Sequence, residues 1–290
     1  MHLDRIDLAD IRYPESLATA VHAQLGEIAP PVPVERIATA LDISEIRTGA
    51  FDGFEGMLLT DRRRSTGAIL ANTTRGTQRA RFTIAHELGH FLMEHHVLTS
   101  EAGFRCRTQD MWETREGRQH QTQETQANTF AIDLLAPVRL VDRHLSDDPD
   151  LRDGLRLRDS LDLSLEACVR RMIDRRPEPL AAVWSEDGQV RYTLRNGGFP
   201  YISLGNGDRI SQMTAAFRAV RNGRRGVTEL TETHAMAWTR NPDLDLFEQT
   251  RVGANGHAVT LLWANSPEGH DEDDEGDDPC HRELGMPRFR

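Results

Sequence analysis

The stretch 76–96 constrains the fold of this chain more than any other, because it combines a helical repeat of apolar residues with the pattern H-E-x-x-H. The apolar residues recur every three or four positions, at Ile84, Leu88, Phe91 and Leu92. On a helix that turns ~100° per residue, His86 and His90 lie on the opposite face, ~40° apart around the axis and ~6 Å apart along it. The sequence therefore predicts a helix that packs by its apolar face and presents two imidazoles to one metal ion.

The same pattern indicates what the metal ion would do. In H-E-x-x-H sites the two histidines bind Zn²⁺, and the glutamate between them, here Glu87, acts as a general base on water. A catalytic zinc ion also needs a third protein ligand and one open position. The candidates for the third ligand are Glu94, His96 and Glu124.

Two of these candidates lie just beyond the pattern. Glu94 continues the series 86, 90, 94, but three groups spread over ~12 Å of straight helix cannot converge on one ion. His96 has the spacing found in metzincins, whose chain leaves the helix at a glycine three residues after the second histidine. Here that residue is Met93, and a continuing helix would carry His96 off the ligand face.

The third candidate, Glu124, lies on a second predicted helix, residues 120–136. The core stripe of this helix consists of Ala127, Phe130, Ala131, Leu134 and Leu135. Glu124 and Asn128 lie at its edge and point partly into the protein, where an unpaired carboxylate is costly and a metal ion is a natural partner. We therefore favour Glu124 over His96, with an ion pair between Glu124 and an arginine as the non-metal alternative. Asn128 is predicted to accept a hydrogen bond from a ligand imidazole and to fix its tautomer.

Charge and cysteine content exclude several classes of protein. The 290 residues include 35 basic ones, all arginine, and 46 acidic ones, for a net charge of −11. Between positions 266 and 290, nine acidic residues stand against three arginines, and this segment is predicted to be a disordered tail. The acidic total disfavours general nucleic-acid binding. Without a long apolar run or a signal-peptide pattern, and with three distant cysteines (Cys106, Cys168, Cys280), the sequence indicates a cytoplasmic protein.

The metal-site motifs resemble those of one family, the ImmA/IrrE metallo-endopeptidases, which are gluzincin-like bacterial proteases. The motifs are Arg81-Phe-Thr-Ile-Ala-His-Glu-Leu-Gly-His90, Glu124-x-x-Ala127-Asn128-x-Phe130-Ala131 and Leu134-Leu135-Ala-Pro137, with Pro-Val-x-x-Ile-Ala at 33–38 and the run 256–263. The resemblance covers most of residues 30–265. It implies that His86, His90 and Glu124 bind one Zn²⁺ per chain and that Glu87 is the general base. The chain departs from the family at Gln126, where relatives often carry an acid, and at Ala136, where methionine is common.

The resemblance and the periodicity together predict an α+β protein with three folded parts. Residues 1–145 are expected to form a zincin-like peptidase domain, with a small mixed sheet and the H-E-x-x-H helix. Residues 146–177 are expected to form a helical unit similar to a helix-turn-helix, and residues 178–265 a GAF-like α+β domain. The acidic tail, 266–290, completes the chain.

The family implies a zinc-dependent endopeptidase that acts on a protein. The expected substrate is a cytoplasmic helix-turn-helix transcriptional repressor, which is cut to relieve repression in a stress, DNA-damage or mobile-element response. The alternative is an antitoxin-like or regulatory protein that recognises this partner without cutting it. The presence of Glu87 favours the enzyme, because a pure binding protein does not need that carboxylate.

Further expectations concern surfaces and partners. The run 67–73 is expected to be an edge strand on which a substrate peptide adds as a further strand. The arginines at 62–64 are expected to form a solvated hairpin tip. Arginine pairs at 170–171 and 175–176 are attributed to packing between domains rather than to DNA binding, and a small ligand is one candidate partner of residues 178–265. No residue is predicted to stabilise the oxyanion.

Overall fold

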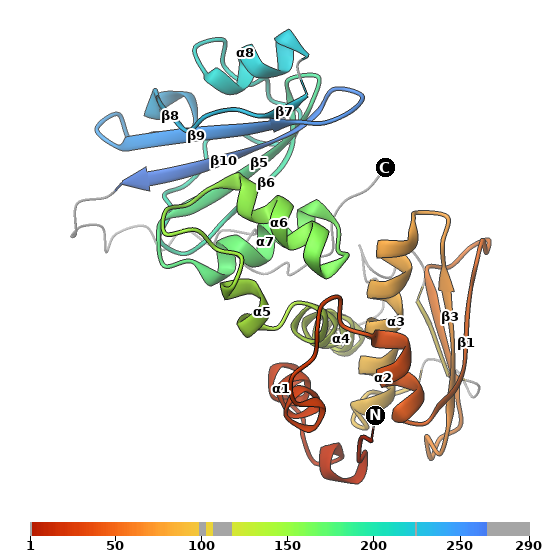
Figure 1. Cartoon of the computed structure of the whole chain (residues 1–290). Helices are drawn as coiled ribbons and strands as arrows, with labels where there is room; N and C mark the ends of the chain where they lie inside the picture. Colours follow the sequence, from red (N-terminus) through yellow and green to blue (C-terminus); the bar gives the residue numbers. More distant parts are fainter. Residues whose placement is uncertain (1, 99–102, 107–117, 224, 266–290) are drawn as a thin grey trace. The chain divides into compact units, whose positions relative to one another are not determined.

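The structure, a computed structural model, describes residues 2–98, 103–106, 118–223 and 225–265 (Figure 1). The predicted acidic tail lies outside the described residues. By their contacts the described residues form two compact units, one within residues 2–140 together with Arg158–Ser164 and the other of Val141–Leu157 with described residues of 165–265. Both units contain helices and strands, as an α+β protein should. None of the described helices is both long and apolar enough to cross a membrane.

The first unit begins with short helical segments and continues with four strands and two long helices. In chain order its elements are η1 (Ile6–Leu8), α1 (Pro14–Leu25), α2 (Val34–Ala40), β1 (Ile43–Gly49), β2 (Gly56–Thr60), β3 (Gly67–Asn72), α3 (Thr77–Leu92), β4 (Gly103–Cys106) and α4 (Arg118–Leu135). Pro14 opens α1 because its fixed φ suits a first helical turn, and Gly26 ends that helix with a φ of 67°. α5 (Val138–Asp142) crosses the boundary between the two units.

The four strands form one small mixed sheet in the order β1-β3-β2-β4. β1 runs parallel to β3, whereas β2 is antiparallel to both β3 and β4. Leu58 of β2 pairs with Ile69 of β3 on one side and with Phe104 of β4 on the other. The expectation that residues 67–73 form an edge strand is therefore wrong: β3 is interior, and β4 and β1 are the edges among the described strands. Local alternation of residues reveals a strand but not its neighbours, which explains the error.

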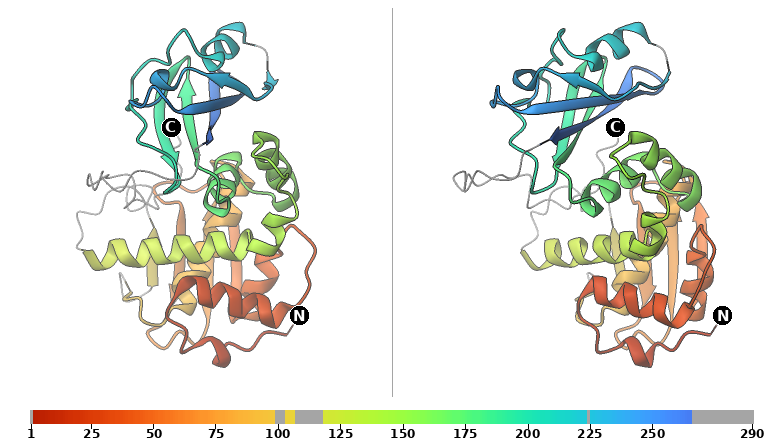
Figure 2. Two further views of the ribbon diagram at one scale, coloured as in Figure 1. Left: turned by 90° about the vertical axis from the view of Figure 1, so that its left-hand side faces the viewer. Right: turned by 60° about the vertical axis from the view of Figure 1, so that its left-hand side comes forward.

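Helix α3 lies between this sheet and α4 (Figure 1). Every residue from Thr83 to Leu92 is buried, so the helix has no solvent face over that length. Phe91 faces the sheet, where its ring lies beside Gly67 of β3. The apolar stripe of α4 predicted from the sequence is fully buried, and α4 also packs along α1 (Figure 2). Both predicted metal-site helices are thus core elements.

The second unit is built on a six-stranded antiparallel sheet. Its elements are α6 (Leu151–Leu161, whose last residues belong to the first unit), α7 (Leu165–Arg175), β5 (Leu180–Glu186), β6 (Gln189–Arg195), α8 (Ala215–Asn222), β7 (Gly226–Val227), β8 (Thr231–Thr233), η2 (Ala235–Ala237), β9 (Asp245–Val252) and β10 (His257–Asn265). The strand order is β6-β5-β10-β9-β7, and β8 also pairs with β9. Trp238 and Phe199 are fully buried in the core of this sheet. The likeness of α6 and α7 to a helix-turn-helix, and of this sheet to a GAF domain, stays a prediction.

Strand β9 shows why part of this unit is hard to read from sequence. Its buried side chains include three polar ones, Glu248, Gln249 and Thr250. Each has a hydrogen-bond partner: Glu248 accepts from the Ala215 N–H at the start of α8, Gln249 accepts from the Leu151 N–H at 2.6 Å, and Thr250 bonds Thr260 at 3.0 Å. Because these hydrogen bonds replace apolar packing, β9 lacks the alternating apolar pattern of a strand.

Candidate metal centre

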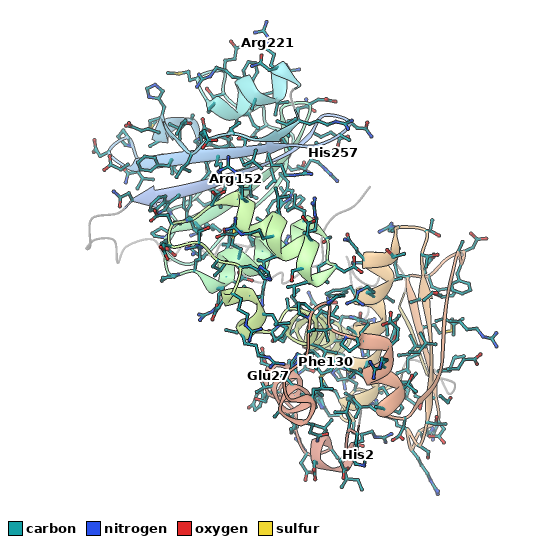
Figure 3. The ribbon with its side chains drawn as sticks, in the orientation of Figure 1. His2, Glu27, Phe130, Arg152, Arg221 and His257 are labelled. Atoms are coloured by element: carbon teal, nitrogen blue, oxygen red, sulfur yellow. The ribbon has the colours of Figure 1, made fainter. Side chains whose placement is uncertain are left out.

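The two helices that carry the predicted ligands approach each other closely at Gly89. A Cβ atom on Gly89 of α3 would lie 2.9 Å from Cδ1 of Phe130 and 3.4 Å from the Ala127 Cα, both on α4. Phe130 is fully buried, and Figure 3 labels it on α4. Since these helices touch at a glycine, side chains one turn away on each helix can meet.

Three side chains meet in the core between these helices: His86 and His90 from α3, and Glu124 from α4. The two Nε2 atoms are 3.1 Å apart. Glu124 places Oε2 at 3.3 Å from His86 Nε2 and Oε1 at 3.2 Å from His90 Nε2. Both histidines are fully buried and Glu124 is 5% exposed. Among the described residues, this group of three is the one arranged to hold a metal ion.

The orientation of both imidazoles is fixed by contacts to their Nδ1 atoms, on the side away from Glu124. His86 Nδ1 lies 2.8 Å from Asn128 Oδ1, the position predicted for Asn128 from its spacing. An amide oxygen only accepts hydrogen bonds, so His86 carries a hydrogen on Nδ1, and Nε2, the atom that faces Glu124, is the nitrogen that can bind a metal ion. His90 Nδ1 lies 2.9 Å from His96 Nδ1. Each ligand candidate therefore points its Nε2 atom into the centre of the group.

The electrostatics of the group suit a cation. Burial by itself would raise the pKa of Glu124, but the charges and hydrogen bonds of His90 and His86 hold this pKa well below its usual value. Burial lowers the pKa of His90 to about 4, and Glu124 offsets this only in part. For His86 the effect of burial is outweighed by the hydrogen bond and charge of Glu124 and by the charge of Glu87, so its pKa is raised. An anionic carboxylate thus faces two imidazoles at one buried point.

Glu87 follows His86 on α3 and is fully buried on the side of β2. Its carboxylate and the methyl group of Thr83 lie against Gly56 of β2, close enough that a side chain at position 56 would overlap both. The absence of a Cβ atom on this strand residue therefore provides the room that the Glu87 carboxylate occupies.

Of the two other candidate ligands, His96 is buried and Glu94 is exposed. The helix ends at Leu92, Met93 follows as its C-cap, and the chain turns back so that His96 is buried beside His90. The expectation that His96 would be carried off the ligand face by a continuing helix is wrong, because the helix does not continue. His96 nevertheless lies behind His90 rather than in the group of three, and burial lowers its pKa to about 2. Glu94 is exposed.

Arg64 departs from the expected solvated tip. It is 4% exposed, has a φ of 51°, and directs its guanidinium at the end of α3. Nη1 donates to the carbonyl oxygens of His90 at 2.5 Å and Met93 at 2.8 Å, and Nη2 donates to that of His96. Arg62 and Arg63 are exposed, as expected for a solvated tip.

His120 is a site residue that the sequence analysis missed. It lies one turn before Glu124 on α4, with Nδ1 at 3.8 Å from Glu124 Oε1, and its side chain is 15% exposed. The spacing of four residues from Glu124 is a signal that could have identified it. Arg64 had no such signal, because a run of three arginines between two strands is typical of an exposed turn.

Comparisons with known proteins agree with the geometry of this centre. The family model described as the IrrE N-terminal-like domain, Peptidase_M78, matches residues 45–172, which include all three members of the metal group. No curated protein matches the sequence.

Among the solved structures that share the fold is that of a protein described as a Mycobacterium tuberculosis transcriptional regulator. It has a TM-score of 0.55 and 13% sequence identity, over 89% of this chain and 80% of that one. The family match confirms the resemblance carried by the two metal-site motifs. Residues 45–172 of this chain therefore match the IrrE N-terminal-like domain of the Peptidase_M78 family.

Proposed function

We propose that this protein is a zinc-dependent endopeptidase. The observation that carries the proposal is the buried group of His86, His90 and Glu124 with Glu87 next to it on the same helix. Two imidazole nitrogens and one carboxylate are the donor set of catalytic zinc sites of the thermolysin kind, which keep a fourth position open. Both Nδ1 atoms are engaged behind the group, so the remaining lone pairs suit Zn²⁺. When bound, zinc supplies Lewis acidity for the scissile carbonyl and for water.

Within this proposal Glu87 moves the proton. Its carboxylate accepts a proton from the attacking water and later delivers it to the nitrogen of the leaving amine. Burial against Gly56 keeps bulk water away from the carboxylate and fixes the direction in which it points.

His120 is the residue that we assign to the developing oxyanion. Its ring is partly exposed beside Glu124, so a substrate carbonyl can approach it from solvent. An imidazole N–H that donates to the oxygen as it gains negative charge stabilises the transition state more than the ground state.

The edge of the first sheet supplies a binding surface for an extended peptide. β4 pairs with β2 on one side, and none of the described strands pairs with its other side. An extended substrate that adds to β4 would form backbone hydrogen bonds without regard to side chains, so its sequence preference would come from neighbouring pockets. β4 takes the role that the sequence analysis assigned to residues 67–73.

The substrate that we propose is a helix-turn-helix transcriptional repressor in the cytoplasm. Its cleavage would relieve the repression of genes of a stress response, a DNA-damage response or a mobile element. The match of residues 45–172 to the Peptidase_M78 family supports a peptidase, and one solved structure with a similar fold is described as a transcriptional regulator. That description also supports a second candidate, a regulatory protein that binds the same partner without cutting it. A small ligand of the second unit and direct DNA binding are not part of either candidate.

One experiment separates these candidates. Zinc content is measured by plasma mass spectrometry, and a candidate helix-turn-helix repressor, chosen from the genes beside this one, is incubated with wild-type protein, with Glu87→Gln and with Glu94→Gln. Glu94 is exposed at the end of the same helix and is the matched control. We expect one equivalent of zinc in all three proteins, a single cut by wild type and Glu94→Gln, and a rate lower by about 10²–10⁴-fold in Glu87→Gln. A stable complex without cleavage would favour the binding protein, and protein without zinc would contradict both the metal site and the mechanism.

A further inference from the structure

The turn after α3 returns a histidine to the back of a metal ligand. Met93 N–H donates to the Gly89 carbonyl at 3.0 Å, and His96 N–H donates to the Met93 carbonyl at 2.9 Å. This tight turn leaves the His96 side chain 3% exposed, although it is only four residues beyond the end of the helix. The proposed function does not use this buried imidazole.

Three side chains form a chain of hydrogen bonds that starts at His90. His90 Nδ1 lies 2.9 Å from His96 Nδ1, and His96 Nε2 lies 2.9 Å from Gln126 Oε1 on α4. His95 Nε2 approaches the same Gln126 oxygen at 3.1 Å. An oxygen that faces two ring nitrogens must accept from both, because an amide oxygen has no hydrogen to donate.

The direction of every bond in this chain follows from Gln126. His96 must carry its hydrogen on Nε2 in order to donate to the amide oxygen. A neutral imidazole has one hydrogen, so His96 Nδ1 is a lone pair that accepts from His90 Nδ1–H. His90 then has its own lone pair on Nε2, the atom 3.2 Å from Glu124 Oε1. The opposite direction would place a hydrogen on His90 Nε2, where it would block a metal ion.

Arg64 holds the turn that presents His96. Its guanidinium donates to the carbonyl groups of Met93 and His96, on either side of the turn, and to that of His90 within the helix. The His90 carbonyl belongs to the last turn of α3, where a helix leaves oxygen atoms without partners within the helix, and the Met93 and His96 carbonyls follow it in the turn. A buried cation here also suits the negative end of the helix dipole.

We propose that His96 is a positioning residue for the metal ligand His90, oriented by Gln126 and held in place by Arg64. His96 fixes His90 in the tautomer that binds metal through Nε2, as Asn128 does for His86. The inference rests on the proposed zinc site, but it concerns metal affinity and tautomer rather than cleavage. A partner of this kind typically changes metal affinity by about 10–100-fold when it is lost.

The test uses two variants of nearly equal size. Asn can place its Oδ1 atom where His96 places Nδ1, whereas Leu fills similar space and cannot accept a hydrogen bond. Zinc affinity is measured for wild type, His96→Asn and His96→Leu by competition with a chromophoric chelator, and thermal unfolding of the metal-free proteins reports their folding. We expect His96→Leu to bind zinc about 10–100-fold more weakly and His96→Asn to bind close to wild type.

If His96 only fills space in the core, His96→Leu should bind zinc at least as well as His96→Asn, because Leu is tolerated in a core at least as well as Asn. Wild-type affinity in His96→Leu, or an equal loss in both variants, would overturn the proposal. If His96→Leu does not fold, ¹⁵N-detected NMR of zinc-loaded wild type decides it: His96 protonated on Nε2 supports the proposal, and His96 protonated on Nδ1 overturns it. If wild type binds no zinc, the proposed function itself fails.

Discussion

Gly56 of β2 and Glu87 of α3 are in direct contact, and the contact exists only because residue 56 has no side chain. A Cβ atom there would overlap Glu87 Oε1 and would lie 2.5 Å from Cγ2 of Thr83. Thr83 is β-branched and buried on a helix, so it cannot turn away easily. The strand backbone therefore determines where the proposed general base can lie.

We expect Gly56→Ala to lower the cleavage rate by about 10²-fold, because a displacement of about 1 Å at a reacting group has an effect of that size. Zinc affinity should stay near wild type, since Glu87 is not among the three metal-binding side chains. Steady-state kinetics and chelator competition measure the two effects. Gly197→Ala is the control, because a Cβ atom at Gly197 meets nothing within 4 Å. Unchanged kinetics in Gly56→Ala would contradict the role given to this contact.

Zinc affinity should begin to fall at a higher pH than it does at an ordinary histidine site. The pKa of His86 is raised above 6.5, so the metal-free protein holds a proton on the imidazole that zinc must displace. As pH falls through this raised pKa, the apparent affinity should fall by about tenfold per pH unit for that one proton. A raised pKa means that the proton on His86 is already bound at a higher pH, so its competition with zinc also begins at a higher pH. Zinc added to weakly buffered metal-free protein near neutral pH should release protons. A zinc affinity that does not change between pH 8 and pH 6 would argue against this linkage.

His120→Ala should lower kcat by about 10²–10³-fold, the effect of removing one donor to an oxyanion. KM and zinc affinity should change little, because His120 approaches Glu124 only to 3.8 Å and is not in the metal group. His120→Gln should recover part of the loss, because an amide N–H can also donate. A loss of zinc in proportion to the loss of rate would instead indicate that His120 supports the ligand Glu124.

The second unit depends on a buried ion pair. Arg176 donates to Asp153 at 2.9 Å, and the side chains are 4% and 0% exposed. Asp153→Ala removes the buried carboxylate partner of Arg176 and leaves the partly exposed Glu178 as its remaining one, so it should lower the free energy of unfolding of this unit by about 3 kcal/mol. Urea unfolding followed by tryptophan fluorescence measures the change. On the same helix, Asp159 forms an exposed pair with Arg158, so Asp159→Ala should change stability by less than about 1 kcal/mol. Equal stability of both variants would contradict the assignment.

The sequence alone predicts the parts of the molecule whose signal is local. The helical repeats around His86 and Glu124 identified α3 and α4. The spacing of Asn128 from Glu124 was enough to predict that Asn128 contacts a ligand imidazole, which is that of His86. Strand order was not predictable in the same way: Ile69 alternates with its neighbours in an interior strand just as it would in an edge strand. Pairing is decided by partners distant in the chain, and no repeat in the sequence records it.

Residues whose role depends on backbone conformation were also missed. Arg64 is buried because its φ of 51° turns its side chain back toward α3, and nothing in three successive arginines indicates such a turn. His96 was misplaced because the end of α3 was not recognised: Met93 is a poor sequence signal for a C-cap, which glycine usually occupies. In β9, buried polar side chains concealed a strand from any search for apolar alternation.

The hydrogen bonds from Arg64 to the end of α3 have a consequence for ligand design. Arg64 is in the turn between β2 and β3, and β2 pairs directly with the edge strand β4. The proposed peptide-binding edge, β4, is therefore linked to the end of α3 through β2 and Arg64, and we expect the spacing between β4 and the metal-binding side chains to vary little. An inhibitor can exploit this constancy: a short rigid β-strand mimic that carries a hydroxamate at one matched distance should bind far better than the same two parts joined by a flexible linker.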